Sequence, residues 1–366
     1  MKEQEHAETC ISKDYDKQTK KYQLTQKIKD KALELGYAAC GVTSAQHFEG
    51  YREEMLDRGN YEFIVNRPKG SFVGAHPEKL TPNAKSIIVT ISDFSKIRYP
   101  EELTQHIGRA YLGREYLAQE KSTQGAKRKL FIDFLSELGI ETYQDNPLCL
   151  PDRPAAARAG VITFGKNNFA YAKGCGSFNI INTFLVDCEL EYDKPTVERP
   201  CPENCTACID ACPTGALYAP GKLDPSKCML FAQIVPAAIS LEMRENLGQH
   251  IHGCDLCQEV CPRNKKVLEN APLTNPFIQR LAEEFSLEKV LLMDDKYYDH
   301  FVKPVMYNYI QERWMFQRNA AIALGNSGDV SQLPALYAAR EKCADQAQEY
   351  IEWAIAKLET PEPVEA

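Results

Sequence analysis

The sequence predicts a mixed α/β fold for the first half of the chain, then a cysteine-rich segment and a helical C-terminal region. Before residue 190, apolar residues recur both at helical spacing and in short β-branched runs. Four cysteines lie within residues 201–212, and three more lie within 254–261. Beyond residue 271 the apolar pattern is helical. These observations favour an α+β or α/β domain ahead of a metal-binding segment.

Composition supports a globular protein that lies in a reducing compartment. The chain has 366 residues, of which 44% are hydrophobic, enough for real cores. The N-terminus lacks an apolar leader and no stretch approaches about 18 apolar residues, so we expect a cytoplasmic protein without membrane contact. In that compartment 14 cysteines favour metal binding over disulfides. A net charge of −8 means that nucleic-acid binding would need a local basic patch.

The elements of the first half follow in order along the chain. Residues 1–20 are polar without periodicity, which predicts a flexible tail. A helical apolar face from Leu24 to Leu35 predicts a helix that stops at Gly36. A strand is expected over 86–92, an amphipathic helix ending at Gly139, and another strand over 178–187. Together they predict an α/β domain over residues 21–190.

Two cysteine motifs with the same spacing predict iron-sulfur clusters over residues 191–270. Both read C-x2-C-x3-C-P, the first ending at Cys212 and the second at Cys261. In bacterial two-cluster ferredoxins the cysteine before proline ligates the other cluster. The first [4Fe-4S] cluster would therefore take Cys201, Cys205, Cys208 and Cys261, and the second would take Cys212, Cys228, Cys254 and Cys257.

Zinc is the alternative occupant of paired C-x2-C units. A zinc ribbon uses four cysteines in two pairs, and it does not explain eight cysteines or a proline after each third one. Iron-sulfur is therefore the favoured prediction. The remaining cysteines are isolated, and only Cys175, within Lys173–Ser177, lies where a cofactor contact is open beside a packing role.

The C-terminal region, residues 271–358, is expected to be helical, with a tail over 359–366. Two helical segments are separated by Gly325–Asp329, and small residues such as Ala320 and Ala321 precede this turn. The pattern favours a helical repeat of the HEAT type. An ordinary helical hairpin stays open as the alternative.

The cysteine motifs, "LDPSKC" and "RNAAIALGNSGD" occur in an order that resembles the epoxyqueuosine reductase family of corrinoid-dependent iron-sulfur reductases, which is related to reductive dehalogenases. The resemblance spans roughly residues 24–358. It implies a nitroreductase-like domain that holds cobalamin, a ferredoxin-like domain with two [4Fe-4S] clusters, and a C-terminal helical repeat. The implied reaction is the reduction of epoxyqueuosine to queuosine in tRNA, an oxidoreductase activity.

The same resemblance implies site residues. The proton donor would be Asp145, with Asn146 and Asp152 as alternatives, although Asp145 also suits a turn before Pro147. Burial under a cofactor would raise the pKa of such a carboxyl and keep it protonated. Residues expected to bind the corrinoid are Arg109, Arg114, Lys166, Asn167 and Ser177, with surface salt bridges as the alternative for both arginines.

Two other functions remain open at this point. One is a related reductase acting on a small electrophile, because residues 301–319 carry few cations where the family has a basic run. The other is a two-cluster electron carrier that serves a partner. A low-potential donor such as a ferredoxin or flavodoxin is expected in each case.

Overall fold

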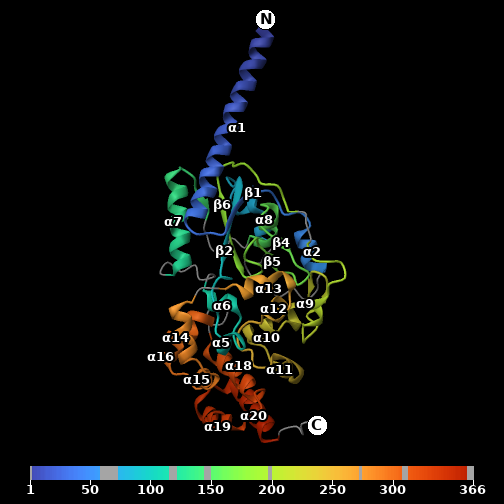
Figure 1. Ribbon diagram of the computed structural model, residues 1–366, viewed down its shortest axis with the longest axis vertical. Helices are drawn as coiled ribbons and strands as arrows, with labels where there is room; N and C mark the ends of the chain where they lie inside the picture. The colour runs from blue at the N-terminus through green and yellow to red at the C-terminus, as the bar shows by residue number, and fades with distance from the viewer. Residues whose placement is uncertain are drawn as a thin grey trace. The chain divides into compact units, whose positions relative to one another are not determined.

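The protein is described by a computed structural model that covers residues 2–57, 73–114, 122–143, 150–196, 200–271, 274–306 and 312–360, with side chains from residue 18 onward except Val73 and Met306 (Figure 1). It divides into two compact units. Unit 1 consists of Met1–Phe94 and Ala118–Glu203, and unit 2 of Ser95–Leu117 and Asn204–Ala366. Within the described ranges, none of the helices combines the length and the apolar character that crossing a membrane requires.

Unit 1 is built on an antiparallel sheet of order β1-β2-β6-β3. The two predicted strands are confirmed as β2 (Ser86–Asp93) and β6 (Asn179–Val186), which pair along their whole length. β1 (Ala39–Ser44) and β3 (Thr142–Tyr143) flank them. Because every pairing is antiparallel, the sheet is of the α+β kind. A separate pair joins β4 (Thr163–Phe164) to β5 (Ala170–Tyr171).

Both faces of this sheet are buried, as the continuous apolar run of β2 predicts. Ile88 faces a core shared with α1 (Lys2–Glu34) and with α7 (Thr123–Glu137), whose predicted end at Gly139 is confirmed by a φ of 73°. Ile87, Val89 and Ile91 face the opposite core with α8 (Asp152–Arg158). The remaining short helices of unit 1 are α2 (Tyr51–Asp57), η1 (Val73–Ala75) and α4 (Pro77–Leu80).

The expected tail over residues 1–20 is instead helical. Helix α1 runs from Lys2 to Glu34, and Gly36 follows its end with a φ of 83° (Figure 1). The physical reason is that Lys, Glu, Gln and Ala form helices readily, so a helix does not require apolar periodicity. Gln18 Nε2 donates to Glu191 at 2.6 Å, which ties this half of the helix to the segment that follows β6.

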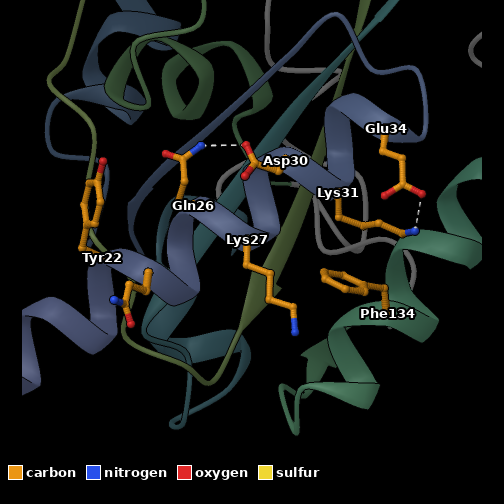
Figure 2. Close-up of a pocket in the computed structure, with 8 residues that line it drawn as sticks. Tyr22, Gln26, Lys27, Asp30, Lys31, Glu34 and Phe134 are labelled. Atoms are coloured by element: carbon orange, nitrogen blue, oxygen red, sulfur yellow. Dashed lines mark hydrogen bonds and ion pairs between the residues drawn. The ribbon is translucent and has the colours of Figure 1, made fainter.

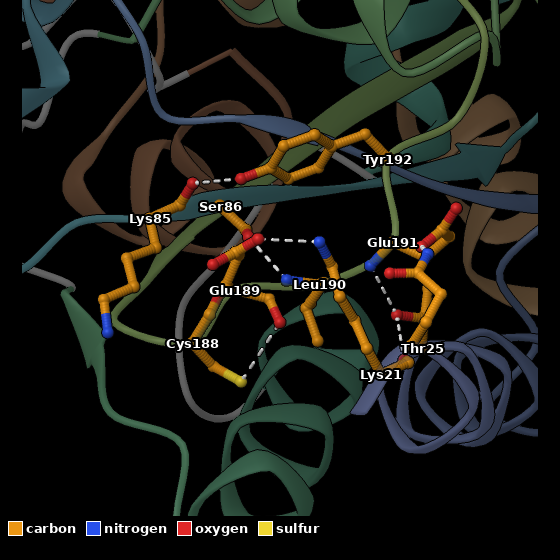
Figure 3. Close-up of polar contacts among 10 residues, drawn as sticks. Lys21, Thr25, Lys85, Ser86, Cys188, Glu189, Leu190, Glu191 and Tyr192 are labelled. Carbon is orange, nitrogen blue, oxygen red and sulfur yellow. Dashed lines mark hydrogen bonds and ion pairs between the residues drawn. The ribbon is translucent and has the colours of Figure 1, made fainter. Parts of the chain in front are cut away.

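Polar contacts hold α1 against residues 188–193 (Figure 3). Lys21 Nζ lies 2.7 Å from the Glu189 carboxylate, and the Glu191 amide donates to Thr25 Oγ1 at 2.9 Å. Ser86 Oγ donates to the Cys188 carbonyl and accepts from the Leu190 amide. The start of β2, the segment after β6 and α1 are therefore joined through side chains.

Unit 2 includes a segment that lies within the α/β domain predicted over residues 21–190. Residues 95–117 carry α5 (Glu101–Thr104) and α6 (Arg109–Gly113), and their apolar side chains belong to the core of unit 2. Leu103, Ile107 and Leu112 are at most 1% exposed there. The predicted boundary at residue 270 does not separate two cores either, because Ile251 and Ile278 share this one. Tertiary packing, rather than chain order, decides both points.

The rest of unit 2 is mainly helical, with one β-hairpin. Its elements are α9 (Ala207–Asp210), β7 (Leu217–Ala219), β8 (Lys222–Leu223), η2 (Pro225–Lys227), α10 (Met229–Ile234), α11 (Leu241–Leu247), α12 (Leu256–Glu259), α13 (Pro262–Glu269), α14 (Pro276–Glu284), α15 (Leu287–Leu291), α16 (Asp295–Tyr297), the π-helical turn η3 (Tyr298–Val302), α17 (Lys303–Met306), α18 (Arg313–Gly325), η4 (Val330–Gln332), α19 (Leu333–Lys342) and α20 (Asp345–Glu359).

The C-terminal region contains three long helices, not the two expected segments. α18 ends at the predicted turn, but the second segment breaks between α19 and α20. Cys343 is extended there, and Gln348 Nε2 donates to the carbonyls of Arg340 and Cys343. This side-chain cap gives hydrogen bonds to carbonyl groups at the end of α19 and allows α20 to turn back onto α18.

Candidate functional site

The two cysteine motifs fold into the same local structure. In each, one residue with φ near −110° and ψ of 3° begins a four-residue helix: Thr206 precedes α9, and Asp255 precedes α12. Both helices end in a residue with ψ between −5° and −10°, and the third cysteine follows. α9 and α12 also pack against each other. The sequence duplication is thus a structural duplication, as expected for a protein that holds two equivalent clusters.

The proline after each third cysteine has a different role in the two motifs. Cys261 is the N-cap of α13, and Pro262 occupies the first helical position, where its missing N–H costs nothing. After Cys212 the chain instead turns at Gly215, with a φ of 61°, into the hairpin of β7 and β8. The first motif therefore leads to Cys228 through this hairpin, whereas the second leads directly into a helix.

Cys212, Cys228, Cys254 and Cys257, the predicted ligands of the second cluster, gather within electrostatic range of one another. Burial raises the pKa of Cys254 to about 12, and Cys228 and Cys212 add to the rise. Burial likewise raises the pKa of Cys257, with further contributions from Cys254, Cys228 and Asp255, and from Cys208 of the first predicted ligand set. Like charges affect each other in this way only at short range. These thiols are therefore neutral without metal, and bound iron would hold them as thiolates because its positive charge offsets theirs.

These cysteines do not converge as ligands of a single ion would. Within the described ranges, no three Cys, His, Asp or Glu side chains come close enough to hold one metal ion. In a [4Fe-4S] cluster each cysteine binds its own iron, so the ligand sulfurs stand farther apart than around one zinc ion. None of the twelve cysteines whose side chains the structure describes forms a disulfide.

A buried imidazole beside Cys254 also fits a site that a cluster would complete. His252 is fully buried, and neither ring nitrogen finds a hydrogen-bond partner within the part of the chain that the structure describes. Its ring lies 4.1 Å from that of Tyr111. Burial lowers the pKa of His252 to about 3, so the imidazole is neutral and keeps one N–H to donate.

Arg109, predicted to bind the corrinoid, lies in an ion-pair network with the helix that carries Cys257. Its Nη1 is 3.2 Å from Asp255 and 2.5 Å from Glu259, and its backbone amide donates to Asp255 at 2.8 Å. Burial alone would lower the pKa of Arg109, but Asp255 and Glu259 raise it above its ordinary value. Arg109 therefore fixes α12, which corresponds to the salt-bridge alternative.

The other predicted corrinoid ligands differ in how well they fit a cofactor. Lys166 Nζ donates to the carbonyls of Pro202 at 2.7 Å and Glu203 at 2.6 Å, and buried Asn167 donates to the Tyr171 hydroxyl at 2.9 Å. Asn167 thus shapes its own loop, and Lys166 ties that loop to residues 202–203. Ser177 is also buried, at 3% exposure.

Arg114 is the residue whose chemistry fits a corrinoid best. Its Nε is buried without a hydrogen-bond partner in the described ranges, and its guanidinium stacks 4.4 Å from the Phe277 ring. Its backbone is left-handed, with a φ of 57°. Cys175, in contrast, is 1% exposed within an apolar core, which agrees with packing.

Of the three predicted proton donors, only Asp152 lies within the described residues; Asp145 and Asn146 lie outside them. Asp152 occupies the first turn of α8, and Thr183 Oγ1 on β6 donates to its carboxylate at 2.9 Å. The side chain reaches solvent, yet surrounding protein is dense enough that desolvation raises the pKa of Asp152 to about 6, against lowering by Thr183, Arg153 and Arg128. An accessible carboxyl with this pKa can hold a proton near neutral pH.

Sequence reasoning gave no role to the arginine and asparagine of "RNAAIALGNSGD". Arg318 and Asn319 are at most 1% exposed inside α18 and bind backbone carbonyls of residues 232–251. A polar pair within an otherwise apolar helical run was the available signal, because a buried polar group needs partners.

Known proteins resemble both the cysteine segment and the whole chain. Residues 201–264 match the model of a 4Fe-4S double cluster binding domain. This range contains all eight predicted cluster ligands. The epoxyqueuosine reductase of Lactococcus garvieae is 30% identical over 355 residues, covering 92% of this chain and 96% of that protein.

Solved structures resemble it over the same extent. The epoxyqueuosine reductase of Streptococcus thermophilus superposes with a TM-score of 0.74 at 25% identity, covering 92% of this chain and 91% of that one. An epoxyqueuosine reductase crystallised with an epoxyqueuosine-modified tRNA-Tyr stem loop has a TM-score of 0.71 at 24% identity, covering 92% and 99%, and thus shares the fold. By its sequence, its cysteine domain and its fold, the chain belongs to the epoxyqueuosine reductase family of oxidoreductases.

Proposed function

We propose that this protein reduces epoxyqueuosine in tRNA to queuosine, with electrons delivered singly through two [4Fe-4S] clusters. The observation that carries the proposal is the duplicated cysteine motif, folded twice in the same way, in a chain of this family. Opening the epoxide to an alkene takes two electrons and two protons and releases the oxygen as water. A low-potential ferredoxin or flavodoxin is the proposed electron source.

The ligand assignment follows the crossover of two-cluster ferredoxins. We assign one cluster to Cys201, Cys205, Cys208 and Cys261, and the other to Cys212, Cys228, Cys254 and Cys257. The influence of Cys228 and Cys212 on Cys254 supports this half of the assignment, while Cys257 lies within range of Cys254, Cys228 and also Cys208 of the first set. We also propose that the first region is nitroreductase-like, the second region ferredoxin-like and the C-terminal region HEAT-like.

Cobalamin is proposed as the third cofactor on the family resemblance. When bound, it would supply a low-valent cobalt able to exchange single electrons beside the substrate. Arg114 is proposed to hold one of its amide or phosphate groups, because its buried Nε lacks a partner among the described residues. Lys166, Asn167 and Ser177 would support it by shaping their loop, and Arg109 by fixing α12.

The protein also has to deliver a proton to the departing oxygen. Asp145 is the proposed donor from the family motif, with Asn146 as its alternative position. Asp152 is the competing donor, and its raised pKa of about 6 supports it, since a general acid works best with a pKa near the working pH. The hydrogen bond from Thr183 would orient its carboxyl group.

A small electrophile is the second candidate substrate, favoured by the paired cations of the C-terminal helices. Arg340 lies 2.6 Å from Glu352, and Lys357 and Arg313 pair with Glu245 and Asp295. Phosphate binding relies on Lys and Arg charges that the protein has not already neutralised. A tRNA substrate would therefore be held by other surfaces of the chain.

The test is anaerobic purification of the full chain with iron and cobalamin, followed by metal analysis and assay. About eight irons per chain and conversion of epoxyqueuosine to queuosine in tRNA would support the proposal. Cys228→Ser should lower the iron content by about half, whereas the matched variant Cys188→Ser should keep it. Eight irons with no turnover of tRNA, but turnover of organohalides, would favour the second candidate. Eight irons without cobalt or turnover would indicate an electron carrier.

A further inference from the structure

Helix α18 carries a buried guanidinium whose Nη1 and Nη2 hydrogen bonds reach residues 232–237. Arg318 is completely buried. It donates from Nη1 to the carbonyls of Val235 and Ala237, both at 3.1 Å, and from Nη2 to those of Ala232 at 3.1 Å and Gln233 at 3.0 Å. Its Nε donates to Asn319 Oδ1 at 3.1 Å. These carbonyls belong to the end of α10 and the turn after it, where a helix leaves acceptors unsatisfied.

Asn319 joins the same helix end to the segment before Cys254. Its Nδ2 donates to the carbonyls of Gln233 and Ile251, both at 3.0 Å. The Gln233 side chain completes the junction, because it donates to the His250 carbonyl at 3.0 Å and accepts from the Gly253 amide at 2.7 Å. Two side chains, Asn319 and Gln233, therefore join α10 to residues 250–253, and Arg318 ties α10 to α18.

The two segments joined in this way each carry a predicted ligand of one cluster. Cys228 is the N-cap of α10, and the Ala232 amide donates to its carbonyl at 3.2 Å. About one helical turn, or about 6 Å along the axis, therefore separates Cys228 from Ala232, the first residue whose carbonyl Arg318 binds. Cys254 follows Ile251 by three residues. The spacing between two thiolates of the second cysteine group thus depends on α18.

Arg318 also places a positive charge in this buried junction. Its hydrogen bonds above go to carbonyl and amide oxygens, and its guanidinium faces the rings of Trp314 at 5.3 Å and Tyr350 at 5.8 Å. Burial lowers the pKa of Arg318 to about 10, which leaves the group protonated at neutral pH. A buried cation stabilises a nearby group more strongly when that group gains an electron, because the low-dielectric surroundings screen the attraction weakly.

We propose that Arg318 and Asn319 are positioning residues for the second cluster, the one assigned to Cys212, Cys228, Cys254 and Cys257. In this role the C-terminal helices are part of the electron-transfer apparatus: Asn319 sets the distance between the ligand segments, and the Arg318 charge raises the reduction potential of that cluster. The inference rests on the proposed cluster assignment.

The experiment is an EPR-monitored redox titration of the full-length reconstituted protein, with iron content measured in parallel and no tRNA present. Arg318→Gln should shift the reduction equilibrium of one cluster about tenfold against the reduced form, or 59 mV for one electron, and leave the other cluster unchanged. Arg318→Lys keeps the charge, so the reduction potential of this cluster should lie close to the wild-type value. Its EPR line shape should change. Asn319→Ala should lower the occupancy of the same cluster.

The matched control is Arg340→Gln on α19, which removes an exposed arginine paired with Glu352 from the same helical region. It should change neither potential. Fully loaded Arg318→Gln with both potentials of the wild type would overturn the electrostatic role, and full occupancy in Asn319→Ala would overturn the positioning role. If Arg318→Gln does not fold, Arg318→Lys and Asn319→Ala still decide the matter. Wild-type protein lacking eight irons would instead contradict the proposed function.

Discussion

The hydrogen bond between Thr183 and Asp152 gives the sharpest test of which carboxyl donates the proton. Thr183 Oγ1 donates to Asp152 Oδ1 at 2.9 Å, and this bond favours the ionised carboxylate. Desolvation acts against it and places the pKa of Asp152 at about 6. Thr183→Val removes the donor with little change in volume, so it should raise the pKa of Asp152 further.

The size of the effect follows from the exposure of the site. A hydrogen bond to a charged group contributes about 1.5–3 kcal/mol, or roughly one to two pKa units when water cannot replace it. Asp152 is exposed, so water takes part of that role, and a rise of about 0.5–1 unit is expected. At pH 7 the protonated fraction would increase from about one tenth to between one quarter and one half.

The assay is the single-turnover rate of epoxyqueuosine reduction between pH 5.5 and 8. The wild-type rate should fall as pH rises through about 6, and Thr183→Val should move this midpoint upward. Asp152→Asn should remove this pH dependence and lower the rate by about 10²-fold, the lower limit for general acid catalysis. Thr90→Val, which removes a buried hydroxyl without a described partner from the same sheet, should leave the midpoint unchanged.

Stability separates a catalytic effect from unfolding. The pKa of folded Asp152 lies above the usual value near 3.9, so the folded state binds this proton more tightly than the unfolded chain does. Ionisation therefore costs stability as pH rises through about 6, and Asp152→Asn should be slightly more stable than the wild type at pH 8. An Asp152→Asn enzyme that keeps the wild-type midpoint would refute this role and leave Asp145 as the donor.

Three further predictions concern stability and substrate binding. Arg109→Gln leaves the buried Asp255 carboxylate without its cation, so urea denaturation should show a loss of about 3 kcal/mol, and a loss below about 1 kcal/mol would contradict the network. Gly41→Ala places a methyl group 2.3 Å from the Ala159 carbonyl oxygen, which should destabilise unit 1 by about 1–3 kcal/mol in thermal unfolding; an unchanged melting temperature would disprove this close approach. Arg340→Gln breaks an exposed ion pair and should change stability by less than about 0.5 kcal/mol and leave the Kd for tRNA unaltered; weaker binding would place tRNA on α19.

The sequence alone determined part of the regular structure and the repeated cysteine spacing. The strands at β2 and β6 and the ends of α1 and α7 at glycines follow from local patterns of apolar and turn residues. The two C-x2-C-x3-C segments likewise fold into matching turns because equal spacing imposes equal geometry. Such features depend on neighbours along the chain, which a sequence displays directly.

The tertiary structure decided what distant segments do to one another. Residues 95–117 join unit 2 because Leu103 and Ile107 are buried in its core, a fact that no local pattern contains. Arg109 meets Asp255 across 146 positions of sequence, and Arg318 meets the end of α10 across more than 80. Charge pairing and carbonyl capping depend on proximity in space, so whether an arginine binds a cofactor, a carboxylate or a helix end is settled only when the chain has folded.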